Sequence, residues 1–291
     1  MTAQVNILTI PHRYRGPPNS GNGGYVCGVL ARHIQEPTEV TLRAPAPLET
    51  PLEAALRDDG SWELMDGPTV VAVARPAPVE LSHLEEASLE EAREAEKNPV
   101  IKPKEHLLPM CFVCGPDRPA GDGLRIMAGP LRRRGRHGRV VQAASWTPYR
   151  NLSADDGLVA AEFVWAALDC PSGYAATYDP DRDGFDKSPV LLGRLAACIS
   201  HRPRAGEGCV VTPPAAGAPL VPPQAACACP RASSRRTGAT ARSFKNTQAA
   251  SVEQIPIERS LVRHVTRHRL GITSHAARLH AARTGTAEGP G

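Results

Sequence analysis

An apolar helical pattern occurs twice in this chain, and this repeat constrains the fold more than any other feature. Tyr25 aligns with Phe163, an offset of 138 residues, and the neighbouring apolar positions align at the same offset. The further pairs are Val26 with Val164, Val29 with Ala167, and Leu30 with Leu168. Self-similarity at a fixed offset is the signature of a duplicated structural unit. The sequence therefore predicts two similar halves, each built around one apolar helix.

Short runs typical of β-strands surround both helical patterns. In the first half, VNILTI precedes a helix over residues 24–34, and TEVTLRAP, PLEAALR, SWELM and TVVAVARP follow it. In the second half, LRIMAGPL and RVVQAASWTP precede the helix AEFVWAALDCPSGYAA, and only SPVLLGRLAACIS and GEGCVVT follow it. Runs of this length between Pro and Asp-Gly turns indicate antiparallel strands. The expected class is α+β, with a second half that is two strands short.

Composition sets the expected boundaries. The first half covers residues 1–97 and ends in an acidic surface helix over residues 81–97. A Pro-bearing linker covers 98–109, and the second half covers 110–212. Residues 213–291 form a tail with 11 Lys and Arg, 3 Glu and no Asp. Because Pro, Ala and Arg dominate it without strand alternation, we expect a disordered tail that is either a basic extension or an out-of-frame translation.

Three segments carry a resemblance to a known family. RYRGPPNSGNGGYVCGVLARHI, CFVCGPDRPAGDGLRI and EFVWAALDCPSG resemble segments of bacterial thioesterase-like proteins in the hotdog thioesterase and dehydratase superfamily. The resemblance covers residues 5–212. It implies a tandem (double) hotdog, in which each half is an antiparallel sheet wrapped around a long central helix. It also implies an acyl-CoA or acyl-carrier thioester substrate, no cofactor, and a possible homodimer.

The glycine-rich stretch before the first helix admits several interpretations. A P-loop would need Lys-Ser/Thr after the glycines, where this chain has Tyr-Val-Cys, and a dinucleotide fingerprint would need Gly at Val26. The remaining interpretation is a helix mouth whose free N–H groups face an acyl carbonyl. Asn22, Gly23 and Gly24 are then the expected substrate-binding residues, and the bare backbone at Gly24 would admit the thioester. The alternative is an Asn cap with glycines that serve close packing.

Two acidic residues on the second helix are the candidate catalytic groups. Glu162 aligns with Gly24, and Asp169 lies seven residues further along the chain. The resemblance implies a site between two helices, one giving N–H donors and the other a carboxylate that attacks or activates water. The alternatives are a first-turn acid that favours the helix dipole for Glu162, and a hydrogen-bonding residue before Cys170-Pro171 for Asp169.

Two further motifs suggest ligands, and neither is assigned one. Cys111-x-x-Cys114 has the spacing of a zinc or redox pair, but no second pair stands at a matching spacing, so no metal site is expected. Cys170 and Cys198 are isolated in the sequence. The basic block of residues 132–139 is expected to be a solvated hairpin tip, with the phosphates of coenzyme A as an alternative contact.

The expected partners and compartment of the protein are inferred from features that its sequence lacks. No apolar run reaches the roughly 18 residues of a membrane span, and the N-terminal residues lack the layout of a signal peptide, so we expect a cytoplasmic protein. The tail is basic but lacks a recognised binding fold, and no nucleic-acid partner is expected. The predicted function is acyl-CoA hydrolysis. The alternatives are a non-catalytic acyl-CoA-binding or assembly protein, and the inactive product of a frameshifted gene.

Overall fold

The computed structural model describes residues 5–79, 86–135, 138, 140–179, 184–185, 190–213, 224–228 and 247–256. Residues 1–255 form one compact unit, to which all described elements belong apart from Pro256 at the end of the last strand. None of the described helices combines the length and the apolar character needed to cross a bilayer.

In the first half, five antiparallel strands surround one central α-helix. The helix is α1 (Gly23–Ala31), and the strands are β1 (Val5–Thr9), β2 (Thr38–Leu42), β3 (Pro51–Leu56), β4 (Trp62–Asp66) and β5 (Thr69–Pro76). The strand order is β1-β3-β4-β5-β2. The predicted Asp66-Gly67 turn joins β4 to β5, and Gly67 has a φ of 53°, which glycine adopts without steric cost. All five predicted strands are confirmed.

The second half repeats this arrangement around a longer helix. The helix is α3 (Ala161–Thr177), and the principal strands are β6 (Gly129–Arg134), β7 (Val140–Trp146), β10 (Val190–Cys198), β11 (Cys209–Thr212), β12 (Gln224–Ala228) and β13 (Thr247–Pro256). A short hairpin of β8 (Tyr178–Asp179) and β9 (Gly184–Phe185) follows α3. The order β7-β11-β12-β13-β10 matches that of the first half, and β6 adds an outer strand.

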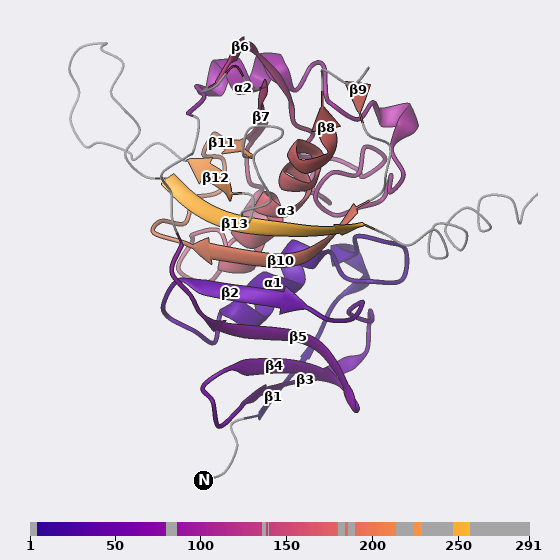
Figure 1. The fold of residues 1–291 in the computed structure, drawn as a ribbon, viewed down its shortest axis with the longest axis vertical. Coiled ribbons are helices and arrows are strands. Elements are labelled where there is room, and N and C mark those ends of the chain that lie inside the picture. The colour runs from indigo at the N-terminus through magenta and orange to yellow at the C-terminus, as the bar shows by residue number, and fades with distance from the viewer. Residues whose placement is uncertain are drawn as a thin grey trace, which may run out of the picture. The chain divides into compact units, whose positions relative to one another are not determined.

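The second half has two strands that the sequence did not predict. β12 and β13 occupy the space between β11 and β10, and Figure 1 shows β13 alongside β10. Val210–Thr212 of β11 pairs with Ala226–Ala228 of β12. The expectation of a half that ends at residue 212 is therefore wrong. An unpaired strand edge accepts main-chain hydrogen bonds even from a segment without hydrophobic alternation. The hydrophobic pattern of the sequence therefore did not predict β12 and β13. The expected disorder of the rest of the tail concerns residues outside the described part of the chain.

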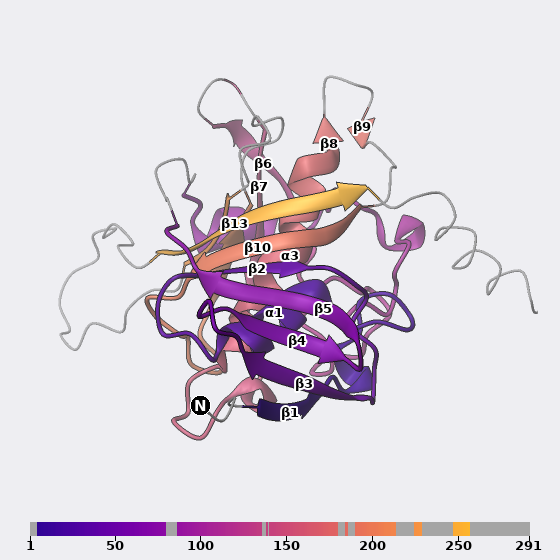
Figure 2. The same ribbon diagram turned by 60° about the horizontal axis from the view of Figure 1, so that its bottom comes forward.

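The two halves share one sheet of eleven strands. Thr38–Thr41 of β2 pairs antiparallel with Arg194–Ala197 of β10 at the junction. Figures 1 and 2 show α1 and α3 covered by the strands of this sheet, and the two helices pack against each other. The two halves of this antiparallel sheet, each wrapped around a central helix, form a double hotdog in the α+β class.

A third helix covers the opposite face of the second half. Helix α2 (Leu89–Ala95) is shorter than the predicted 81–97, of which residues 81–85 lie outside the described part. Its Ala92 and Ala95 pack on Val141 and Ala143 of β7, whereas Ala144 and Trp146 of that strand face the main core. Both faces of β7 are therefore buried, and six of its seven residues are fully buried.

The basic block near the end of β6 pairs with this acidic helix. Arg132 Nη2 lies 2.9 Å from Glu94 Oε1, and Arg133 Nε lies 3.0 Å from Glu91 Oε1. Both arginines are thus partnered by carboxylates within the chain. This pairing weakens the alternative in which the block contacts phosphates of coenzyme A.

Candidate functional site

The loop before α1 fixes the start of that helix. Asn22 is 2% exposed, and its Oδ1 accepts a hydrogen bond from Tyr25 N at 3.0 Å, which makes it the N-cap of α1. Its own backbone N–H donates to Tyr14 O at 2.8 Å. The backbone N–H and the side-chain oxygen of Asn22 are therefore both bonded, which leaves the side-chain nitrogen Nδ2 for a partner on another element.

That amide nitrogen meets the carboxylate of Asp169 on α3. Asp169 Oδ2 accepts hydrogen bonds from Asn22 Nδ2 at 2.9 Å and from Gly24 N at 3.0 Å, and the residue is 7% exposed. The structure thus brings Asp169 to the N-terminus of α1, where the backbone carries a partial positive charge. Three of the five residues singled out from the sequence converge here, two from the first half and one from the second.

Glycines on α1 let α3 approach closely. A Cβ at Gly24 would lie 2.7 Å from Trp165 O and 2.8 Å from Asp169 Cβ, and one at Gly28 would lie 2.5 Å from Glu162 Cα. Gly24 therefore lacks a side chain because α3 occupies that space. This corrects the expectation that its bare backbone opens to a substrate, because its Cα faces a helix and its N–H is already bonded to Asp169.

Gly23 keeps the one N–H of this turn that bonds to no other described group. The next N–H groups along the chain donate to Asp169 and to Asn22. Gly23 is half-buried, and a Cβ added there would meet the side chains of Leu192 and Leu42. The unpaired donor at the helix mouth therefore belongs to Gly23.

Glu162 does not join this group. It lies beside Gly28, one turn further along α1, and is separated from Asp169 by seven helical residues, a rise of about 10 Å. Its charge reaches Tyr25, whose phenol pKa is raised mainly by burial and further by Tyr14 and Glu162. The structure separates the two carboxylates that the sequence proposed together.

A cluster of thiols beside the site was missed from the sequence. Cys111, Cys114 and Cys170 place their sulfur atoms within 4.8 Å of one another, and Asn22 Nδ2 lies 4.0 Å from Cys111 Sγ. Cys170 follows Asp169 directly on α3. Cys170 lies 59 residues from Cys111 in the sequence, so the spacing did not predict that their sulfur atoms meet. For Cys170, the only indication in the sequence was its position next to the candidate catalytic residue Asp169.

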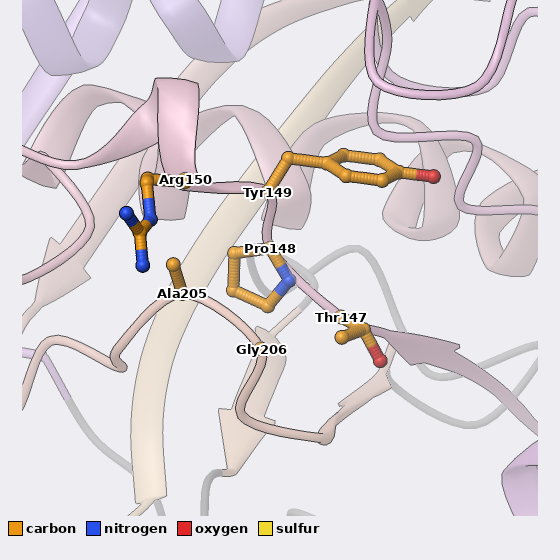
Figure 3. Close-up of a pocket in the computed structure, with 6 residues that line it drawn as sticks. All are labelled: Thr147, Pro148, Tyr149, Arg150, Ala205 and Gly206. Atoms are coloured by element: carbon orange, nitrogen blue, oxygen red, sulfur yellow. The ribbon is translucent and has the colours of Figure 1, made fainter.

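An open depression lies elsewhere on the second half. Its volume is about 450 Å³, and Figure 3 shows its lining from two loops, residues 147–150 and 205–206. None of these residues contacts Asp169 or Asn22 through a described hydrogen bond. The depression therefore forms no part of the candidate site.

Comparison with solved structures returns proteins whose names describe thioesterases and dehydratases. A TesB protein from Mycobacterium avium subsp. paratuberculosis has a TM-score of 0.48 at 11% identity, over 88% of this chain and 93% of that one. A putative thioesterase II from Thermobifida fusca has a TM-score of 0.45 at 11% identity, over 86% and 92%. A dehydratase from the difficidin assembly line has a TM-score of 0.46 at 10% identity, over 91% and 98%.

Comparisons by sequence return nothing. No protein-family model matches the chain, and no curated protein matches it. The double hotdog assignment therefore rests on the strand order of the two halves and on the packing of α1 against α3.

Proposed function

We propose that the chain hydrolyses acyl thioesters, with acyl-CoA or an acyl-carrier thioester as substrate, in the cytoplasm. The observation that carries this proposal is the pair of hydrogen bonds from Asn22 and Gly24 to Asp169 Oδ2. They hold a buried carboxylate of one half at the helix N-terminus of the other. In the proposal, this carboxylate is the base and the N-terminus of α1 supplies N–H donors, the two kinds of group that attack on a thioester carbonyl requires.

In the proposed reaction, Asp169 acts as the general base. Its carboxylate takes a proton from a water molecule as the water oxygen bonds to the thioester carbon. The carbonyl oxygen gains charge and accepts a hydrogen bond from Gly23 N–H, supported by the positive end of the α1 dipole. When the carbon–sulfur bond breaks, the proton on Asp169 passes to the departing thiolate, which leaves a carboxylic acid, a free thiol and the original carboxylate.

Asn22 and Gly24 are positioning residues in this scheme. Asn22 caps α1 through Oδ1 and holds Asp169 through Nδ2, so one side chain sets both the donor and the base. The Gly24 N–H donates to the same Oδ2 atom. The fixed carboxylate needs little reorganisation when a substrate binds, which is the usual advantage of a site built on helices.

The same hydrogen bonds support a second candidate, an acyl-binding or assembly protein without catalysis. Two of the N–H donors near the start of α1 are already satisfied by Asp169. A buried carboxylate in this position can serve only to join two helices across the halves. In that case the duplicated fold is retained and the chemistry is lost.

The variant Asp169→Asn separates the two candidates. The purified chain is incubated with a panel of acyl-CoA thioesters, and released thiol is followed with a thiol reagent. We expect Asp169→Asn to lower kcat/KM by about 10²–10⁴-fold, since that is the usual cost of losing a positioned acid or base. Acyl-CoA binding, measured by calorimetry, should stay within a few-fold.

Glu162→Gln is the matched control, because it removes a carboxylate from the same helix about 10 Å away. It should retain turnover and the melting temperature of the parent. Full activity in Asp169→Asn would exclude the proposed role of Asp169. Acyl-CoA binding without turnover in the parent chain would favour the non-catalytic candidate.

A further inference from the structure

Three buried sulfur atoms lie together where a loop of the second half meets α3. Cys111 and Cys114 are 2% and 3% exposed, and Cys170 is half-buried. The distance from Cys111 Sγ to Cys170 Sγ is 3.7 Å, and all three residues are free thiols. In a tetrahedral zinc site with Zn–S bonds of about 2.3 Å, two sulfurs stand about 3.8 Å apart. The 3.7 Å between Cys111 Sγ and Cys170 Sγ matches this sulfur–sulfur distance.

The Cys-Phe-Val-Cys-Gly turn is shaped to hold two sulfurs on one side. Cys111 N donates to Leu108 O, and Gly115 N donates to Cys111 O, both at 2.9 Å. A Cβ at Gly115 would lie 2.4 Å from Cys111 O, so the turn closes only around glycine.

The loop that carries this turn is anchored on both sides. Arg118, 3% exposed, donates from Nε to Met110 O and from Nη1 to Asp122 Oδ2. Phe112 N donates to Arg15 O in the loop before α1. The third sulfur is on α3, next to a proline that lacks a backbone N–H. The three side chains are thus placed by two anchored segments, the loop that carries Cys111 and Cys114 and the helix α3 that carries Cys170.

Thiolates this close together repel one another, because the Sγ atoms of Cys111, Cys114 and Cys170 all lie within 4.8 Å of one another. A soft divalent metal ion offsets this repulsion and suits sulfur ligands.

We propose that Cys111, Cys114 and Cys170 bind one Zn²⁺ ion through three thiolates, with the fourth position open to water or an added ligand. Each sulfur forms one Zn–S bond, and any proton it carries is released to solvent. Zinc suits a set of soft sulfur ligands with no imposed redox change. Two cysteines alone could instead form a disulfide, but that would leave the third sulfur buried without a partner.

The metal would tie three segments together beside the candidate active site. It would join the loop after the linker to α3, and Asn22, which contacts Cys111 Sγ at 4.0 Å, connects this point to α1. Binding would therefore stabilise the surroundings of Asp169 without contacting a substrate. The inference is independent of thioester hydrolysis, because its readouts are metal content and thermal stability.

The test uses the full chain, purified under reducing conditions after expression with added zinc. Elemental analysis should find one zinc ion per chain. Replacing zinc with Co²⁺ should produce a sulfur-to-cobalt charge-transfer band and the intense visible bands of tetrahedral cobalt. Loss of a group that only hydrogen-bonds to a metal ligand lowers metal affinity by roughly 10–100-fold, so Cys170→Ser, which removes a sulfur ligand, should lower it by at least about 100-fold. Chelation should lower the melting temperature of the parent chain.

Cys198→Ser is the control, because Cys198 is a half-buried free thiol outside the cluster. It should keep the metal and the melting temperature. If Cys170→Ser fails to fold, the cobalt spectrum of the parent chain still decides the matter. A folded parent chain without zinc, without a cobalt–sulfur band, or with a disulfide between two of these cysteines would overturn the proposal.

Discussion

The two halves share their strand order and differ in their helices. β1-β3-β4-β5-β2 and β7-β11-β12-β13-β10 follow the same path, although all five strands of the first set and only three of the second were predicted from the sequence. Helix α1 has 9 residues with glycines towards its partner, and α3 has 17 residues with an acid and a cysteine side by side. The shared sheet preserves the fold, while the two helices have become specialised.

This difference shows where a duplicated fold can diverge. Strand pairing depends on backbone hydrogen bonds, so it tolerates many side chains. The contact between α1 and α3 depends on side-chain size at each position, because Gly24 and Gly28 leave no space for a Cβ. Substitutions should therefore destabilise the contact between α1 and α3 more than they destabilise the sheet.

The largest effect is expected from removing the last two strands of the second half. A chain that stops after Thr212 loses β12 and β13, which exposes the edges of β10 and β11 and one side of α3. Open strand edges and apolar surface drive aggregation. We expect an insoluble product without a cooperative melting transition, measured by expression, gel filtration and calorimetry. A soluble truncated chain with the parent melting temperature would show that these strands contribute nothing.

The origin of the tail can be checked at the same boundary. The hypothesis of a frameshift predicts that another reading frame after the codon for Thr212 encodes two alternating strands joined by an Asp-Gly type turn. Grafting that segment after Thr212 should raise the soluble yield above that of the present chain. An equal or lower yield would favour the present tail as the native one.

Gly28→Val should produce the next largest loss of stability. The added Cβ would lie 2.5 Å from Glu162 Cα, a backbone atom that cannot move aside without shifting α3. Overpacking of this kind costs about 1–3 kcal/mol, which exceeds the few tenths that valine recovers over glycine in helix propensity. Urea unfolding measures the difference. Gly208→Ala is the control, since its Cβ would meet only the flexible end of Leu89, and a loss as large there would argue against a special helix contact.

Removing the Asn22 side chain should have a smaller effect. Asn22→Ala loses an N-cap, at about 0.5–2 kcal/mol, together with a hydrogen bond to Asp169. Ser88→Ala removes the N-cap of α2 without any link between the halves, so it measures the cap alone. A double-mutant cycle with Asp169→Asn should give a coupling of about 0.5–3 kcal/mol. Additive effects would mean that the two side chains do not act as a unit.

The smallest predicted effect is a dependence on pH in the first half. His33, after α1, stacks on Trp62 with ring centroids 4.2 Å apart, and burial lowers its pKa from the ordinary value of 6.5, with a further contribution from Arg32. The folded state therefore favours the neutral ring. Its stabilisation is complete above pH 6.5 and declines as the pH falls towards the lower folded pKa. His33→Phe keeps the stacking on Trp62 and should remove the fall in melting temperature that His33 causes below pH 6.5. An unchanged pH profile would assign the dependence to other groups.

Much of the fold was predictable because its signals are local. The apolar spacing in α1 and α3, and the Asp66-Gly67 turn, determine elements through neighbouring residues. β12 and β13 were not predictable, since their place depends on the edges that β10 and β11 leave open. In the site, the resemblance implied a carboxylate of one helix beside the N–H donors of the other, but it did not specify the hydrogen bond between Asp169 and Asn22. The role of Gly24 in packing and the meeting of Cys170 with Cys111 depend on contacts between distant segments, which spacing along the chain does not reveal.

The antiparallel packing of α1 and α3 also limits the number of sites. The pseudo-twofold axis that relates the halves should generate a second copy of the site, at residues offset by 138. That copy has Ala31 in place of Asp169, and Ala160 and Glu162 in place of Asn22 and Gly24, and Ala160 makes no side-chain cap for α3. A symmetric dimer of identical halves would hold two equivalent centres. Here one copy has lost its carboxylate and its capping amide, so an unreactive acyl-thioester analogue should saturate the protein at one equivalent per chain.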